Sequence, residues 1–257
     1  MSVFERTRPV DYLERLAASD LGRGYKSLAV TELGINRGDI VLDLGCGPGV
    51  DLPAFAAEVG PSGMVIGLDR DAALVEQAAA STAELSQVVV RECDIHAIDL
   101  PDASVDHVHT DRVLQHVADP AAVLAQARRV LRPGGSAVFV EPDWDTLIID
   151  HPDVAVVRAY TRFVTDEVVR NEYIGRQLSG LAIAAGFAVT NVIPITTVFR
   201  DVRTADQVLG LGRVTDRAVT SGYLTASEGE RFLAHLTTRP FFASATLFLI
   251  AVTAVLR

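Results

Sequence analysis

A strand that runs directly into a glycine loop is the strongest constraint on how this chain can fold. The apolar residues Ile40–Leu42 precede Asp43, and glycines occupy every second position from Gly45 to Gly49. Glycine lets the backbone turn sharply and approach a ligand at distances where a Cβ atom would clash. The N–H groups of such a loop, with the start of the helix that follows, face a polar ligand group. The pattern therefore predicts a nucleotide-type binding loop.

A second carboxylate lies where the next predicted strand ends. Asp69 follows the apolar run 64–68 and lies 20 residues after Gly49. A carboxylate at a strand end with this spacing meets the hydroxyl groups of a ribose, and it can accept hydrogen bonds from both of them. The alternative is that Asp69 only caps the helix that begins near Asp71.

Strands and helices alternate over the first half of the chain, which indicates a parallel sheet with helices on both faces. The length of 257 residues suits one α/β domain with additions. Strands are predicted at 40–44, 64–68, 88–91, 105–110 and 136–141, and helices at 52–59, 71–85 and 119–131.

The second half departs from this alternation. Residues 143–171 are expected to form an additional, mostly helical piece, and 204–238 another helical insertion. A helix at 175–185 and a strand at 189–199 are predicted between them. The apolar run 242–256 is short for a membrane helix and rich in β-branched residues, so we expect a buried strand that closes the sheet.

The glycine loop and its acids resemble the first motifs of class I S-adenosylmethionine (SAM)-dependent methyltransferases. Gly45, Gly47 and Gly49 follow Asp43 with a spacing that differs from the G-x-G-x-x-G of dinucleotide sites. The turn 131–135 resembles the helix-to-strand connection of the small-molecule and quinone-type branch.

This resemblance implies an α/β, Rossmann-like fold with helices on both faces of a seven-stranded, mostly parallel sheet. The last strand is expected to lie antiparallel between strands five and six. The chain 1–257 is then a single methyltransferase domain with N-terminal helices, a SAM-binding core and two helical cap insertions. The corresponding ranges are 1–34, 35–142, and 143–174 with 200–240.

The resemblance also implies which residues bind SAM. Asp94 and Ile95 resemble the adenine-binding motif, although a turn-forming aspartate is the alternative. Arg112 is one candidate for pairing with the SAM carboxylate, and Arg23 or Tyr25 from the N-terminal helices is the alternative. The expected cofactor-binding residues are Asp43, Gly45, Cys46, Gly47, Gly49, Asp69, Arg70, Asp94, Ile95, Arg112 and Tyr25.

His116 is the candidate for catalysis. An imidazole titrates near neutrality and can remove a proton from an acceptor. In the resembled family, however, a histidine in this loop often only shapes the site. Trp144 and Asp143 follow the fifth strand and border the expected cleft, so they are predicted to contact the substrate together with His116. His107 and His109 share one strand face and are expected to be satisfied by neighbouring side chains. No metal site is expected.

The amino-acid composition limits which binding partners are expected. The net charge of −10 disfavours binding to nucleic acid. The sequence contains no Lys/Arg cluster of the kind that binds an anionic membrane surface. Lys26 is the only lysine, a bias typical of a GC-rich bacterial genome. Cys46 and Cys93 lack a CxxC spacing, and residues 1–6 contain no signal-peptide pattern, so a cytoplasmic location is expected. A homodimer is a possible assembly of this chain.

These features favour a SAM-dependent methyltransferase that acts on a small, partly hydrophobic acceptor, such as a secondary metabolite or a quinone-like molecule. One alternative is a SAM-binding protein without transferase activity, serving as a cyclase, scaffold or regulator. A less favoured alternative is an NAD(P)-linked oxidoreductase. The glycine spacing disfavours it, and so does Gly22, which lies four residues before Lys26 where a Tyr-x-x-x-Lys pair needs tyrosine.

Overall fold

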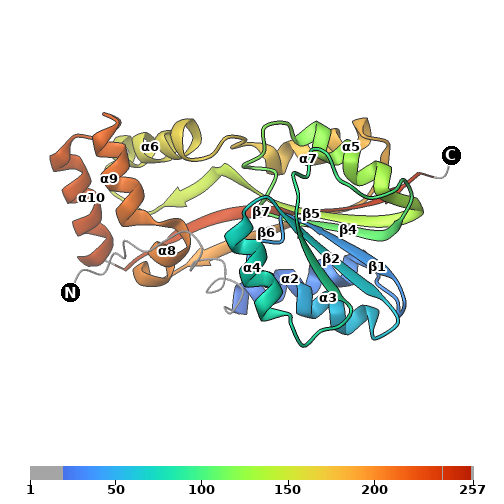
Figure 1. The fold of residues 1–257 in the computed structure, drawn as a ribbon. Coiled ribbons are helices and arrows are strands. Elements are labelled where there is room, and N and C mark those ends of the chain that lie inside the picture. The colour runs from blue at the N-terminus through green and yellow to red at the C-terminus, as the bar shows by residue number, and fades with distance from the viewer. Residues whose placement is uncertain (1–19, 239, 256–257) are drawn as a thin grey trace.

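A central sheet organises the protein. The computed structural model describes residues 20–238 and 240–255, within which seven strands form one sheet in the order β3-β2-β1-β4-β5-β7-β6 (Figure 1). The strands are β1 (Ile40–Leu44), β2 (Met64–Asp69), β3 (Val88–Glu92), β4 (Val105–Asp111), β5 (Leu131–Ile149), β6 (Phe187–Phe199) and β7 (Ala243–Ala254).

Strands β1 to β5 pair in parallel, whereas β7 runs antiparallel to both of its neighbours, β5 and β6. The Rossmann-like sheet expected from the sequence, with its antiparallel last strand between the fifth and sixth, is therefore confirmed. The apolar run at the end of the chain forms β7. Within residues 20–238 and 240–255, no helix has both the length and the apolarity that crossing a bilayer requires.

Helices cover both faces of the sheet because the strands are apolar on both faces. In β1, Val41 packs on one face, while Leu42 and Leu44 pack on the other. The first face is covered by α2 (Asp20–Leu33), α3 (Leu52–Val59) and α4 (Ala72–Ser81), and the second by α5 (Pro120–Val130) and α7 (Ile174–Ala184). In Figure 1, α2 and α3 lie below the sheet, and the two helices of the second face lie above it.

Aspartates determine where two of these helices begin. A side-chain oxygen of Asp71 accepts the N–H of Ala73 at 2.9 Å, and one of Asp119 accepts the N–H of Ala122 at 3.0 Å. Each bond satisfies an N–H group that the first turn of a helix leaves without an intrahelical partner. Of the N-terminal helices predicted over 1–34, α2 is observed, and the part at 1–19 lies outside the described residues.

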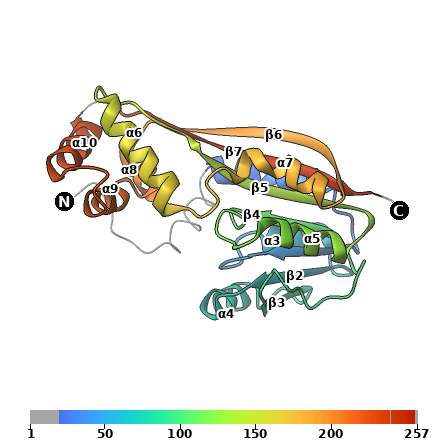
Figure 2. The ribbon, with the colours of Figure 1, turned by 90° about the horizontal axis from the view of Figure 1, so that it is seen from above.

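A second group of helices, which we call the helical lobe, packs around the far ends of β5, β6 and β7 (Figure 2). Its core contains fully buried aromatic side chains, including Tyr160 and Phe232, whose ring centroids lie 5.0 Å apart. The lobe consists of α6 (Val154–Phe163), the π-helix η1 (Val164–Val168), α8 (Val202–Leu209), α9 (Leu211–Thr220) and α10 (Ala226–Thr238).

The predicted helical character of the segment that begins at Asp143 is wrong for its first part. Strand β5 continues to Ile149, because Asp143 pairs with Thr246 of β7 and Ile149 pairs with Ala243. Exposure alternates along this end of the strand, since Leu147 and Ile149 are buried while Ile148 is 58% exposed. Helix α6 starts only after Asp153, whose side chain caps it. The division of the chain into a core and two cap insertions stays a prediction.

The lobe core gives a stability prediction. Phe232→Ala should lower the free energy of unfolding by about 3–5 kcal/mol, because the ring is fully buried and its removal leaves a cavity. Phe242→Ala is the matched control, since that ring is 39% exposed and should contribute much less. Urea denaturation of both variants measures the difference. Equal losses would contradict the tight packing of the lobe.

Candidate active site

The glycine loop between β1 and α3 adopts a backbone that other residues rarely reach. Gly45, Gly47 and Gly49 have φ angles of 70°, 54° and 83°. A Cβ atom on Gly45 would lie 2.5 Å from a methyl carbon of Val113, and one on Gly49 would lie 2.9 Å from the Cβ of Ala78. The backbone conformation therefore favours glycine at all three positions, and the lack of space also requires it at Gly45 and Gly49. The loop presents bare backbone at the carboxyl ends of the parallel strands.

Asp69 reaches this loop from the end of β2. One carboxylate oxygen accepts the N–H of Gly47 at 2.9 Å, and the other accepts the N–H of Asp71 at 3.0 Å. The carboxylate is thus oriented beside the glycine loop. Arg70, the next residue, is exposed.

Asp94 lies beyond the end of β3 and is exposed. One of its oxygens accepts the backbone N–H of His96 at 2.9 Å and lies 2.7 Å from Nδ1 of the same residue. These hydrogen bonds lower the pKa of Asp94, so the side chain is a carboxylate at neutral pH. Ile95 beside it is buried.

Asp43 and Cys46 are buried and engaged within the protein. Asp43 lies 2.8 Å from Nδ1 of His109 on β4. Burial alone would lower the pKa of His109, but the hydrogen bond and charge of Asp43 outweigh it and raise that pKa. Burial, together with the nearby carboxylates of Asp43 and Asp69, raises the pKa of the Cys46 thiol. The side chains of Asp43 and Cys46 are therefore engaged inside the protein, and His109 is satisfied by a neighbour as expected.

A cluster of charges that the sequence did not reveal ties α2 to the sheet. Lys26 Nζ lies 2.6 Å from Asp51 and 2.7 Å from Asp111, and Tyr25 donates its hydroxyl to Asp111 at 2.8 Å. Burial alone would raise the pKa of Asp111, but the charges of Arg112 and Lys26 hold it well below its ordinary range. Tyr25 and Arg112, both expected near the SAM carboxylate, thus meet at Asp111. The only signal in the sequence was that Lys26 is the sole lysine.

The loop after β4 is held by two side chains, Glu141 and Asn171. From β5, the fully buried Glu141 accepts the N–H groups of Val113 at 2.7 Å and Leu114 at 2.5 Å. Burial raises the pKa of Glu141 to about 8, although these N–H donors act to lower it. Asn171 donates its amide to the carbonyl oxygens of Leu114 and Val117 at 2.7 and 2.9 Å. The loop therefore has one defined shape.

His116 lies on this loop and is exposed. Desolvation by the surrounding protein, and then the charges of Arg70 and Arg112, lower the pKa of His116. At neutral pH the imidazole is therefore uncharged, the form that can accept a proton. Arg112, four residues earlier, has a φ of 58°, a left-handed conformation that is uncommon for residues other than glycine.

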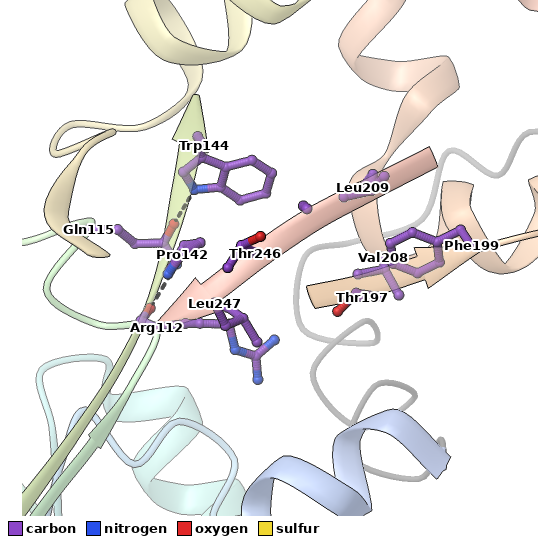
Figure 3. Close-up of a pocket in the computed structure, with 11 residues that line it drawn as sticks. Arg112, Gln115, Pro142, Trp144, Thr197, Phe199, Val208, Leu209, Thr246 and Leu247 are labelled. Carbon is purple, nitrogen blue, oxygen red and sulfur yellow. Dashed lines mark hydrogen bonds between the residues drawn. The ribbon is translucent and has the colours of Figure 1, made fainter. Parts of the chain in front are cut away.

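A cavity of about 70 Å³ lies where the loop after β4 and the end of β5 meet β6, β7 and α8 (Figure 3). Its walls are mostly apolar and are contributed by side chains such as Trp144, Phe199, Val208, Leu209 and Leu247.

The structure separates the residues expected to contact substrate. Trp144 lines the cavity, and its indole N–H donates to Gln115 at 2.8 Å. Asp143 is buried and points to Arg176, with an Nη2 to Oδ1 distance of 2.7 Å. In the described part of the chain, Gln115 lines the cavity but the adjacent His116 does not. No group of three or more potential metal-binding His, Cys, Asp or Glu side chains occurs in the described part of the chain.

Comparison with known proteins identifies the family. Residues 35–172 match the model of a methyltransferase domain. The chain is 57% identical, over 250 residues, to an uncharacterized 37.1 kDa protein in transposon TN4556 of Streptomyces fradiae, and the match covers 96% of this chain and 72% of that protein.

A demethylmenaquinone methyltransferase of Staphylococcus aureus is 28% identical over 141 residues. That match covers 55% of this chain and 58% of the enzyme, so less than two thirds of the enzyme is spanned. The crystal structure of a SAM-dependent methyltransferase from Aquifex aeolicus shares the fold with a TM-score of 0.56 at 18% identity, covering 95% of this chain and 99% of that one. The glycine loop, the strand order and the matching family model together place this chain in the methyltransferase domain family, as a class I SAM-dependent methyltransferase.

Proposed function

We propose that this enzyme transfers a methyl group to a small, partly apolar molecule bound in the cavity beside Trp144. The position of the cavity carries the proposal. Gln115 enters it from the loop after β4 and Trp144 from β5, so the cavity adjoins the sheet edge that holds the glycine loop. Open α/β sheets bind their ligands beyond the carboxyl ends of the strands.

The residues at this edge fit SAM. The left-handed glycines leave the backbone bare where a Cβ atom would collide, and Asp69 is held beside them by the N–H of Gly47. We assign the ribose to Asp69 and the adenine to Asp94 and Ile95. Because Asp43 bonds to His109 and Tyr25 bonds to Asp111, we assign these two a supporting role instead of a direct contact.

When bound, SAM supplies a methyl group that is already activated by the sulfonium charge. The protein then has mainly to align the reacting groups. The Glu141 and Asn171 hydrogen bonds give the loop after β4 a defined shape, and this loop carries His116. His116, which follows the cavity-lining Gln115 on this loop, is the candidate to take a proton from the acceptor in its neutral form.

The cavity is too small for a ring-shaped acceptor without adjustment. An apolar cavity of roughly 150 Å³ is known to admit benzene, and the cavity here measures about 70 Å³. Trp144 or the α8 side chains Val208 and Leu209 therefore have to shift when such an acceptor binds. The acidic net charge supports a small molecule over nucleic acid. Location in the cytoplasm and pairing into a homodimer stay predictions from the sequence.

Incubation of the purified protein with methyl-labelled SAM and a panel of small acceptors tests the proposal. Label should appear in at least one acceptor, and quinol-type and terpenoid alcohols belong in the panel because they are partly apolar. If SAM binds but label stays in SAM with every acceptor, a SAM-binding protein without transferase activity becomes the better interpretation.

Asp69→Asn should weaken the binding of S-adenosylhomocysteine by about tenfold or more, because hydrogen bonds to a charged group are worth more than those to a neutral one. Isothermal titration calorimetry measures the change. Asp102→Asn is the control, since that carboxylate is exposed and pairs with Arg129 away from the glycine loop. Unchanged affinity in Asp69→Asn would remove Asp69 from the ribose site.

If His116 acts as a general base, His116→Ala should lower kcat by roughly 10²–10⁴-fold with little change in S-adenosylhomocysteine affinity. Because only the neutral ring accepts a proton and the pKa of His116 is lowered from 6.5, wild-type kcat should decline as the pH falls through a value below 6.5. This limb of the pH profile should disappear in the variant. His151→Gln, in the helical lobe, should leave the profile unchanged. A normal kcat in His116→Ala would mean that His116 only shapes the site.

A further inference from the structure

The polar side chains around the cavity are almost all occupied by partners within the protein. The amide of Gln115 donates to the carbonyl oxygen of Arg112 at 3.1 Å and accepts from Trp144 at 2.8 Å. The hydroxyl of Thr246 bonds to that of Thr196 at 3.1 Å. Both hydrogen bonds of Gln115 are visible in Figure 3. Each of these groups is therefore already oriented by a partner within the protein.

Thr197 differs from Gln115 and Thr246. It lies on β6 opposite Ala245 of β7, lines the cavity and is only 7% exposed. Its hydroxyl makes no hydrogen bond to any residue in the described part of the chain. In Figure 3, Thr197 lies across the cavity from Gln115 and Arg112. Its oxygen is not among the fully buried atoms, so a ligand oxygen in the cavity can form a hydrogen bond with it without breaking an existing one.

The charges beside the cavity balance one another. Arg112 donates Nε to one oxygen of Asp111 at 2.9 Å and Nη2 to the other at 3.3 Å. Lys26 bridges Asp111 and Asp51, so two cations face two carboxylates. An anionic ligand would meet no net positive charge here and would lie close to Asp111. Burying an uncompensated charge in this position is costly.

From these observations we propose that the acceptor is a neutral, largely apolar molecule that carries one hydroxyl or carbonyl oxygen, and that Thr197 holds this oxygen. The proposal deepens the proposed function and rests on it, because it takes the cavity as the acceptor site. It makes Thr197 a specificity-determining residue and excludes acceptors whose apolar body ends in a carboxylate or a phosphate.

Trp144 provides a direct test, because it is the only tryptophan of the chain and lines the cavity. The full-length protein, saturated with S-adenosylhomocysteine, is titrated with octan-1-ol and separately with octanoate while tryptophan emission is recorded. These probes share an apolar chain and differ in charge. We expect octan-1-ol to bind about tenfold more tightly or better, because octanoate has to bury its charge.

Substitutions then assign the preference to one hydroxyl. Thr197→Val keeps the shape of the side chain and should weaken octan-1-ol binding about fivefold, the effect of losing one hydrogen bond between neutral groups. Thr197→Ser keeps the hydroxyl and should retain the preference for the alcohol. Thr190→Val, at an exposed position of the same strand, is the matched control and should bind both probes like the wild type. Normal S-adenosylhomocysteine affinity shows that each variant is folded.

Each contrary result has a distinct meaning. Octanoate binding as tightly as octan-1-ol overturns the neutral acceptor, and an unchanged alcohol affinity in folded Thr197→Val overturns the role of Thr197. Both results leave methyl transfer in the cavity intact. If neither probe changes the Trp144 emission while S-adenosylhomocysteine binds, the cavity is not the acceptor site, and both the inference and the proposed location of transfer fail.

Discussion

A single buried acidic side chain, Glu141, holds the loop between the glycine loop and the cavity. Glu141, at the end of the parallel part of β5, binds the backbone N–H groups of the loop that follows β4. On one side this loop places Val113 against Gly45, where only a glycine fits. On the other side it places Gln115 in the cavity wall. The hydrogen bonds of Glu141 therefore hold the loop that lies between the glycine loop and the cavity in one position.

The elements that local sequence patterns determine were predictable. Strand β1 and helix α3 have the predicted bounds, because each is an apolar run with a glycine or proline signal beside it. The extension of β5 to Ile149 was not predictable, since it depends on pairing with β7 about a hundred residues away in the chain. A polar, interrupted segment such as 143–149 becomes a strand only because a partner strand lies beside it.

The residues of the candidate site also fall into a group that local sequence patterns indicate and a group that long-range packing brings together. The glycine loop and Asp69 follow from spacing alone, because a strand, a tight turn and a helix are adjacent in sequence. The cluster of Lys26, Asp51 and Asp111 unites three separate elements, and nothing local indicates it. The cavity likewise takes walls from the loop after β4 and from β5, β6, β7 and α8, so a residue such as Thr197 has no distinguishing local pattern. Long-range packing creates the cavity, whereas local backbone chemistry creates the side expected to bind SAM.

The last residue of β6, Phe199, pairs directly with the first residue of β7, Ala243. The whole chain between them, which carries α8, α9 and α10, thus leaves and re-enters the sheet at adjacent points. A tight hairpin turn could close the same gap, and the closure cost of a longer connection rises only slowly with its length. This connection can therefore be replaced by one of another length, in evolution or by design. Such a replacement would alter the cavity wall that Val208 and Leu209 contribute, while the glycine loop keeps its geometry.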